Sequence, residues 1–262
     1  MTRFELILIG FGNVAQRFVT LLSEQRRTLA RHHDLTTRVI GIATKRRGQA
    51  FSRRGVDARA LVAGTRSSVD FVREAVKKSA TAARQGRLVV VETTTLDIAR
   101  GQPAIDHVRA ALAGGAHVVT ANKGPVAFAY RDLARIAERA RRRFLFEGAV
   151  MDGVPLFNLA RETLPAVNIV GFRGVVNSTT NFILTAMEQG QPFAQALAEM
   201  QSVGIAEADP SLDVDGWDAA AKAAALANVL LGARLTPRTV ERTASRPRWD
   251  DARLTRVRRD GV

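Results

Sequence analysis

A glycine turn between an apolar run and a helical pattern is the feature that most constrains the fold of this chain. The sequence FELILIGFGNVAQRFVTLL places Gly10 and Gly12 behind a strand-like run, and Ala15 completes a G-x-G-x-x-G/A pattern. Gly10 permits a tight turn, and Gly12 lets the backbone and the following helix N-terminus approach a pyrophosphate. Glycine turns also serve plain strand-to-helix connections, so the context between strand and helix carries the prediction. We expect a dinucleotide to contact Gly10, Phe11, Gly12, Asn13 and Val14.

The second strand-like run, RVIGIAT, predicts which dinucleotide binds. It ends at Thr44 and is followed by Lys45 and Arg46, and no acid occurs from residue 38 to residue 52. An acid at this place would bind the adenosine ribose hydroxyls, whereas a cation accommodates a 2′-phosphate. The sequence therefore predicts NADP, contacted by Lys45 and Arg46, with NAD as the alternative.

Two further strand candidates end in polar residues. RLVVVETTTL leads to Thr93, and AHVVTANKGPVAF leads to Asn122 and Lys123. Alternating strands and helices predict a parallel sheet, which binds ligands at the carboxyl ends of its strands. We expect Thr93, Asn122 and Lys123 at the cofactor site, with Gly124-Pro125 fixing the turn behind the lysine. The alternative for Lys123 is a solvent-exposed loop lysine.

An acid-rich stretch stands out in the second half of this basic chain. No Lys or Arg occurs from residue 174 to residue 221, although the chain has 39 of them among 262 residues and a formal net charge of +14. Such a segment favours a pocket for a cation that the protein does not itself supply. Five carboxylates precede a single lysine, Lys222: Glu207, Asp209, Asp213, Asp215 and Asp218.

The residues 217–231 are rich in Ala and Leu and contain no Gly or Pro, which predicts a buried helix starting near Asp215 or Gly216. Asp218 and Lys222 are spaced i, i+4 and so share a face of it. Burial disfavours the charged amine and the acids favour it, so Lys222 is suited to proton donation. A structural Asp218–Lys222 pair is an equal alternative, and the spacing of a calcium loop is absent.

The chain divides by composition into three parts. Residues 1–140 predict an α/β, Rossmann-type parallel-sheet dinucleotide-binding domain. Residues 141–235 predict a second, α+β domain, in which NIVGFRGVVNSTTNFILTAM forms a strand, a polar loop and a helix, with Ser178 or Thr179 as an alternative helix cap. Residues 236–262 form a divergent, arginine-rich tail that looks truncated or poorly ordered.

Composition excludes several classes of function. The chain has no cysteine, so disulfides, thiolate catalysis and cysteine zinc sites are ruled out. The first apolar run is too short to span a bilayer and does not resemble a signal peptide, so we expect no membrane and a cytoplasmic location. Aromatic residues make up 6% and no nucleic-acid motif occurs, so the basic excess predicts a solvated surface and no nucleic-acid partner.

Three longer motifs resemble the homoserine dehydrogenase family. GVVNSTTNFILTAMEQG is similar to that family's asparagine-threonine signature, GIAEADPSLDVDGWDAAAK to its active-site signature, and VVTANKGP to its cofactor-side lysine motif. With GFGNV these matches cover most of residues 5–232, and the active-site pattern is highly specific. The resemblance implies NAD(P)H-dependent interconversion of L-aspartate 4-semialdehyde and L-homoserine, in threonine, methionine and isoleucine biosynthesis. It also implies a homodimer, with residues 141–235 as the catalytic and dimerisation domain.

The resemblance also assigns roles by motif position. It implies that Lys222 donates the proton to the carbonyl oxygen and that Lys123 lies beside cofactor and substrate. Residues that would bind the substrate or position the lysine are Glu207, Asp213, Asp218, Asn177 and Thr179. A sodium ion would be held by oxygens of Glu147, Val150, Asp152 and Val154.

Two other functions remain open on the sequence. The chain could be an inactive or truncated NADP-binding homologue, since the sequence after LGARLTPRTVER loses the resemblance and soon stops. It could also be another NADP-dependent oxidoreductase that acts on a small amino acid. A panel of substrates separates the second reading, and loss of turnover with retained cofactor binding would support the first.

Overall fold

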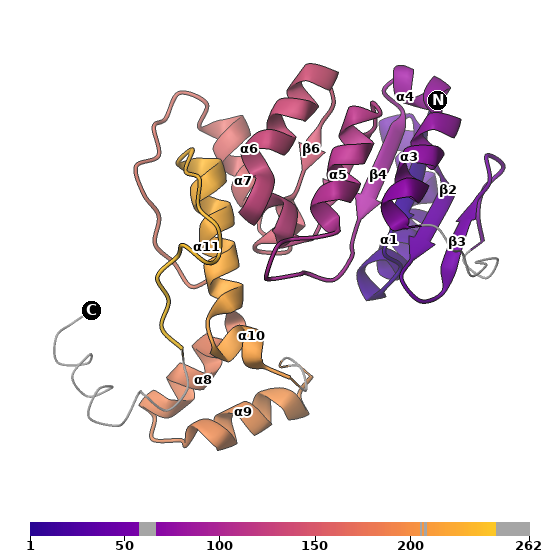
Figure 1. Ribbon diagram of the computed structural model, residues 1–262. Helices are drawn as coiled ribbons and strands as arrows, with labels where there is room; N and C mark the ends of the chain where they lie inside the picture. Colours follow the sequence, from indigo (N-terminus) through magenta and orange to yellow (C-terminus); the bar gives the residue numbers. More distant parts are fainter. Residues whose placement is uncertain (58–66, 205, 207–208, 245–262) are drawn as a thin grey trace. The chain divides into compact units, whose positions relative to one another are not determined.

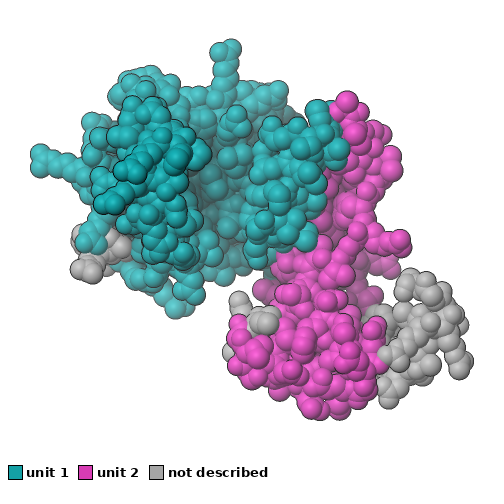
Figure 2. All heavy atoms as spheres, turned by 180° about the vertical axis from the view of Figure 1, so that it is seen from behind, with its two compact units in different colours: residues 1–165 teal, residues 166–262 magenta. Residues whose placement is uncertain are grey.

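The computed structural model describes residues 1–57, 67–204, 206 and 209–244. The chain divides into two compact units, residues 1–165 and 166–262, which are coloured separately in Figure 2. Each unit has a hydrophobic cluster of its own. The limits of the three predicted sequence regions, at residues 140 and 235, stay predictions. No helix among the described residues is long and apolar enough to cross a membrane.

A six-stranded sheet with the order β3-β2-β1-β4-β5-β6 forms the centre of the first unit (Figure 1). All neighbouring pairs are parallel except β2 and β3. The parallel sheet is therefore confirmed, whereas the antiparallel edge strand was not predicted. The strands are β1 (Thr2–Ile9), β2 (Leu35–Thr44), β3 (Gly48–Phe51), β4 (Leu88–Glu92), β5 (His117–Thr120) and β6 (Phe144–Leu145).

The strand order reverses at β1, which lies between β2 and β4. Ligands of such sheets bind at this reversal, beyond the carboxyl ends of the strands. The connecting helices are α1 (Asn13–Glu24), α2 (Arg26–His33), α3 (Ser68–Lys78), α4 (Ala80–Arg84), α5 (Ala104–Ala113) and α6 (Lys123–Ala140), followed by the short 3₁₀ helix η2 (Glu147–Ala149) and α7 (Leu156–Thr163).

Apolar side chains cover both faces of the sheet. Leu6 and Leu8 of β1 lie in a buried cluster that includes Phe18 and Leu22 of α1. Ile7 is fully buried and alternates with them, so it faces the other side, where α3 and α5 pack on β1 and β4 (Figure 1). Each fully buried Leu or Ile side chain contributes about 1.5–3 kcal/mol, so this core fixes the strand ends that carry the site.

The second unit is helical in its described residues. Its helices are α8 (Ser178–Glu188), α9 (Phe193–Ser202), α10 (Ser211–Val214) and α11 (Trp217–Leu230). Ile183, Ala196 and Met200 form the centre of a buried cluster. The helix predicted at residues 217–231 is thus confirmed within one residue.

The strand predicted ahead of Asn177 does not form in this chain. Residues 166–177 are irregular, and no described strand of the second unit pairs with them. Val170 is 88% exposed and Val175 is 65% exposed, so the apolar pattern that predicted a strand has no sheet to pack on. A strand needs a neighbour that accepts its backbone hydrogen bonds, and local sequence cannot supply one.

The chain segment after α11 contacts that helix through hydrogen bonds and a cation–π interaction. Asn228 accepts a hydrogen bond from the Leu235 N–H at 2.8 Å and donates one to the Leu235 carbonyl at 3.0 Å. The Arg242 guanidinium lies 3.6 Å from the centroid of the Trp217 ring. Residues 232–244 therefore have defined contacts, although they form neither helix nor strand, and the rest of the predicted tail lies outside the described residues.

Candidate active site

The glycine turn lies between β1 and α1, and its two glycines have different roles. Gly10 has φ +87°, and a Cβ there would lie 2.6 Å from the Thr93 carbonyl oxygen, so a side chain is excluded. Gly12 is the N-cap of α1, and nothing lies within 4 Å of a Cβ at that position. No side chain caps α1, whose first residues are Asn13 and Val14. Helix N-termini of this kind present N–H groups to anions, as the sequence predicts for a pyrophosphate.

The basic turn predicted after β2 connects that strand to β3. Lys45 and Arg46 are both exposed in it. The turn is fixed because the Thr44 hydroxyl accepts a hydrogen bond from the Arg47 N–H at 2.8 Å and donates one to the Gly48 carbonyl at 3.1 Å. The carboxyl end of β2 therefore carries positive charge, as a 2′-phosphate site requires.

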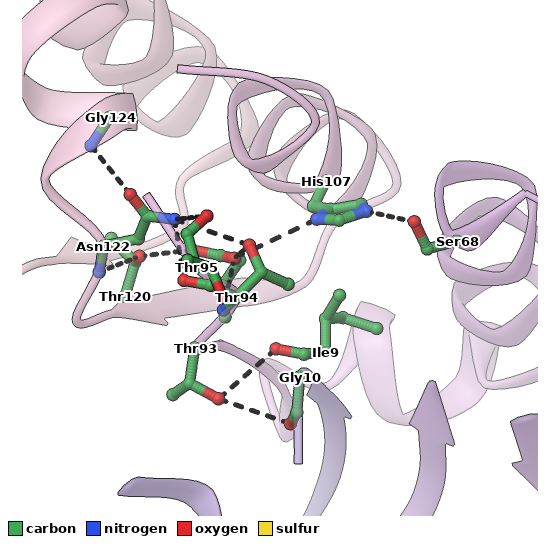
Figure 3. A network of polar contacts seen from close by, with 11 residues as sticks. Ile9, Gly10, Ser68, Thr93, Thr94, Thr95, His107, Thr120, Asn122 and Gly124 are labelled. Atoms are coloured by element: carbon green, nitrogen blue, oxygen red, sulfur yellow. Dashed lines mark hydrogen bonds and ion pairs between the residues drawn. The ribbon is translucent and has the colours of Figure 1, made fainter. Parts of the chain in front are cut away.

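The polar residues after β4 and β5 meet at the carboxyl edge of the sheet, as predicted (Figure 3). The Thr93 N–H donates to the Ile9 carbonyl at 2.8 Å, and the Thr93 hydroxyl donates to the Gly10 carbonyl at 3.3 Å. The Asn122 amide donates to the Thr94 carbonyl at 2.9 Å. Residues from three neighbouring strands are thus joined at one edge.

Lys123 is the first residue of α6, not a residue of an exposed loop. It is half-buried, and Asn122 caps the helix by accepting a hydrogen bond from the Gly124 N–H at 2.9 Å. Gly124 and Pro125 lie in the first helical turn, so the turn predicted behind the lysine is wrong. Proline suits this position because the first helical N–H groups have no intrahelical partner.

Sequence reasoning missed a buried acid at the end of β4. Glu92 is fully buried and accepts hydrogen bonds from the Thr94 N–H at 2.9 Å and from the Thr120 hydroxyl at 2.7 Å. Burial raises the pKa of Glu92, and the hydrogen bonds from Thr94 and Thr120 oppose that rise. The signal for this buried acid in the sequence was a glutamate that directly ends the apolar run LVVV.

The second unit brings together most of the residues predicted for catalysis. Lys222 Nζ lies 2.9 Å from Asp218 Oδ2 and donates a hydrogen bond to the Val176 carbonyl at 2.6 Å. The Asn177 amide donates to Asp213 Oδ1 at 2.7 Å and to Asp218 Oδ2 at 2.9 Å. The side chains of Lys222 and Asp218 are only 15% and 14% exposed. An amine held among carboxylates in partial burial can stabilise and protonate an oxygen that gains negative charge.

Of the two helix starts at this cluster, that of α8 differs from the sequence prediction and that of α11 confirms it. Asn177 caps α8 by accepting a hydrogen bond from the Thr180 N–H at 2.8 Å, so Ser178 and Thr179 are the first helical residues and not caps. Gly216 is the N-cap of α11, with φ +76° and no capping side chain. Asn177 therefore combines two tasks, because its carbonyl caps a helix while its amide binds two carboxylates. Glu207 lies outside the described residues, and Thr179 is buried in α8.

The loop predicted to hold sodium runs from η2 to α7. The two carboxylate oxygens of Glu147 accept hydrogen bonds from the Phe157 N–H at 2.8 Å and the Asn158 N–H at 3.0 Å, so this side chain caps α7. The Val154 carbonyl accepts one from the Leu156 N–H at 2.8 Å. Val150 is buried and Asp152 has φ +41°. Within the described residues, no group of three or more His, Cys, Asp or Glu side chains is arranged for a metal.

The reversed strand order, the open glycine turn and the polar carboxyl edge define a dinucleotide-binding α/β protein, and its second unit adds an amine–carboxylate site. The family model described as "Homoserine dehydrogenase, NAD binding domain" matches residues 10–147, and the model described as "Homoserine dehydrogenase" matches residues 155–260. The chain belongs to the homoserine dehydrogenase family. The second match extends to residue 260, so the expectation that the sequence after LGARLTPRTVER loses the resemblance is wrong.

Relatives with this name cover most of the chain. An NAD(+)-dependent homoserine dehydrogenase of Pseudomonas canavaninivorans is 38% identical over 246 residues, which are 90% of this chain and 68% of the relative. A homoserine dehydrogenase of Sulfurisphaera tokodaii is 34% identical over 90% of this chain and 72% of its own length. The crystal structure of homoserine dehydrogenase from Thermoplasma acidophilum matches with a TM-score of 0.74 at 25% identity, over 93% of this chain and 74% of that one.

Proposed function

We propose that this protein catalyses the NAD(P)H-dependent interconversion of L-aspartate 4-semialdehyde and L-homoserine, a step toward threonine, methionine and isoleucine. The observation that carries the proposal is the cluster of Lys222, Asp218, Asn177 and Asp213 in a chain of this family. A partly buried amine with two carboxylates suits an amino-acid substrate, whose ammonium needs acids and whose carbonyl oxygen needs a proton donor.

The bound nicotinamide would supply the hydride that reaches the aldehyde carbon. Lys222 then stabilises the developing negative charge on oxygen and donates the proton that completes the alcohol. Two of the three N–H donors of its ammonium are used by Asp218 and the Val176 carbonyl, which fixes the direction of the amine. Asp213 and Asp218 would also attract the substrate ammonium, with Glu207 as a further acid. Thr179, two residues after Asn177, is the remaining residue proposed to bind the substrate.

NADP is the proposed cofactor. Lys45 and Arg46 in the exposed turn after β2 support it, because their charge suits a 2′-phosphate. The relative from Pseudomonas canavaninivorans is named for NAD(+), so the two cofactors must be compared directly. Gly10, Phe11, Gly12, Asn13 and Val14 would bind the pyrophosphate end, and Thr93, Asn122 and Lys123 the nicotinamide end.

A sodium ion in the loop from Glu147 to Val154 is a second proposed ligand. Oxygen atoms are the ligands of hard cations, and a run of backbone carbonyls can supply them. The Glu147 carboxylate is engaged with α7, so main-chain oxygens of Glu147, Val150, Asp152 and Val154 are the candidates. Thermal unfolding tests this proposal. If sodium binds this loop, the protein should unfold at a lower temperature when sodium is replaced by choline at equal ionic strength.

We propose that the protein forms a homodimer through the exposed segment 166–177. Val170, Phe172 and Val175 are 88%, 44% and 65% exposed, and no described strand of the second unit pairs with this segment. A second copy could supply both the backbone partners and the apolar cover. Sedimentation of the purified protein tests the stoichiometry. The proposed partners are a small-molecule substrate and a second copy of the chain, and no nucleic acid is expected. The proposed location is the cytoplasm.

One assay tests the activity. Purified protein is mixed with NADPH and L-aspartate 4-semialdehyde, and loss of NADPH absorbance is followed beside a panel of other small amino-acid aldehydes. The proposal expects turnover with the semialdehyde and little with the rest. Binding of NADPH without any turnover would support an inactive cofactor-binding homologue, and turnover of a different aldehyde would identify another oxidoreductase.

A further inference from the structure

The carboxyl group of Glu92 joins the chain segments that follow two neighbouring strands. Glu92 is the last residue of β4 and lies opposite Thr120, the last residue of β5. One carboxyl oxygen accepts hydrogen bonds from the Thr94 N–H at 2.9 Å and from the Thr94 hydroxyl. The other accepts one from the Thr120 hydroxyl at 2.7 Å (Figure 3). A single side chain therefore holds both loops at the carboxyl edge.

The same network continues to the start of α6. The Thr120 hydroxyl accepts a hydrogen bond from the Asn122 N–H at 3.0 Å, and the Asn122 amide donates to the Thr94 carbonyl at 2.9 Å. Asn122 in turn caps α6 through the Gly124 N–H. Displacement of the Glu92 carboxyl would therefore move the first turn of the helix that begins at Lys123.

No positive charge from the described residues lies against this buried acid at neutral pH. His107 of α5 lies close by, with its Nδ1 4.0 Å from Glu92 Oε1, which is beyond hydrogen-bond distance. Burial lowers the pKa of His107 to about 4, against the opposite effect of Asp106, so the ring is neutral. Its Nε2 lies 2.7 Å from the Ser68 hydroxyl of α3.

A fully buried carboxyl group beside a neutral histidine costs free energy that an apolar side chain would not. The positions of its hydrogen-bond donors indicate the role of the Glu92 carboxyl group. All three donors belong to residues that follow or end a strand at the ligand-binding edge, and none belongs to the apolar core. Rigid support of this type keeps a binding surface in its productive geometry.

We propose that Glu92 is a positioning residue for the cofactor, because its carboxyl group ties the loop after β4 to the loop after β5 and so fixes the backbone at Thr94 and Asn122. The inference rests on the proposed function only in that this edge binds the nicotinamide cofactor. Glu92 itself contacts neither cofactor nor substrate in this proposal. Thr120 is the relay through which the effect reaches Asn122.

Replacement of Thr120 separates positioning from mere folding. Thr120→Val keeps the shape but removes the hydroxyl, and Thr120→Ser keeps the hydroxyl. Val72→Ala is the control, because Val72 is fully buried on α3 and its truncation weakens the core without touching the edge. Affinity for NADPH is measured by its fluorescence, well below the unfolding temperature of each variant, together with hydrogen exchange at residues 93–95 and 120–124.

The expected result is a loss of NADPH affinity of roughly tenfold in Thr120→Val, with faster amide exchange in both loops, while Thr120→Ser and Val72→Ala bind within about twofold of the original chain. If Thr120→Val does not fold, Glu92→Gln serves the same comparison, since it preserves size and removes one acceptor. Unchanged affinity in a folded Thr120→Val or Glu92→Gln protein overturns the inference alone. Failure of the unaltered chain to bind NADPH or NADH overturns the proposed function as well.

Discussion

Lys222 Nζ lies 2.9 Å from Asp218 Oδ2, one helical turn earlier on α11. The same carboxylate accepts a hydrogen bond from Asn177, which also binds Asp213. The Asp218 carboxylate is therefore shared between the Lys222 amine and the side-chain amide of Asn177, which lies at the start of α8. A plain surface ion pair would be more exposed and less connected. The catalytic and the structural interpretation of this pair both stay predictions.

Lys222→Ala should lower kcat by about a hundredfold to ten-thousandfold, because general acid catalysis contributes on that scale. Affinity for NADPH should stay unchanged. Lys78→Ala is the matched control, since Lys78 is exposed on α3 and pairs with Glu74. Steady-state rates and NADPH titration measure both effects. Full activity in Lys222→Ala would exclude this lysine as the proton donor.

The two glycines of the first turn should respond in opposite ways to alanine. Gly10→Ala should destabilise the first unit by several kcal/mol, because the residue has φ +87° and its Cβ would lie 2.6 Å from the Thr93 carbonyl oxygen. Gly12→Ala should leave stability nearly unchanged, since its Cβ position is open, and should weaken cofactor binding by obstructing the pyrophosphate. Urea unfolding and NADPH titration compare the pair. Equal stability losses would contradict the assignment.

The basic turn should control the choice of cofactor. Arg46→Ala should reduce affinity for NADPH by roughly tenfold and leave affinity for NADH nearly unchanged, because only NADPH carries the 2′-phosphate. Arg26→Ala is a suitable control, since Arg26 is an exposed residue that begins α2. Titration of each protein with both cofactors measures the ratio. An equal loss for NADH would place Arg46 elsewhere than at the 2′ position.

His107 should make the protein less stable in acid. Its pKa is lowered from 6.5 to about 4 by burial, so the unfolded chain binds a proton that the folded chain does not. The stability it contributes is complete above pH 6.5 and is lost as the pH falls toward about 4, by roughly 3 kcal/mol in total. His107→Gln should flatten this part of the stability profile in urea unfolding. The same acid-dependent slope in both proteins would argue against a neutral, buried ring.

Local patterns predicted those parts of the fold that depend on local physics. The strand before Gly10, the helix after Gly12 and the helix that carries Lys222 all follow from hydrophobic periodicity and from residues with special backbone freedom. The spacing of Asp218 and Lys222 predicted their contact, because an α-helix places residues four apart on one face.

Features that depend on distant partners were missed or wrong. Glu92 binds Thr120 across 28 residues of sequence, and its burial follows only from how β4 and β5 pair. The segment before Asn177 has the composition of a strand, but pairing requires a neighbour that no local pattern specifies. Asn177 caps α8 in place of the alternatives Ser178 and Thr179, because its side-chain oxygen accepts the Thr180 N–H. The start of α11 at Gly216, by contrast, was predicted.

The contact between Gly10 and the Thr93 carbonyl has a consequence for how this protein can change. Two backbone segments meet there without any side chain between them, so substitution at that point disrupts the scaffold before it alters selectivity. Lys45 and Arg46, by contrast, are exposed on the hairpin between β2 and β3, where we expect replacements to be tolerated. On the proposed cofactor contacts, we expect preference between the two nicotinamide cofactors to evolve on the hairpin, while the glycine contact preserves the ability to bind a dinucleotide.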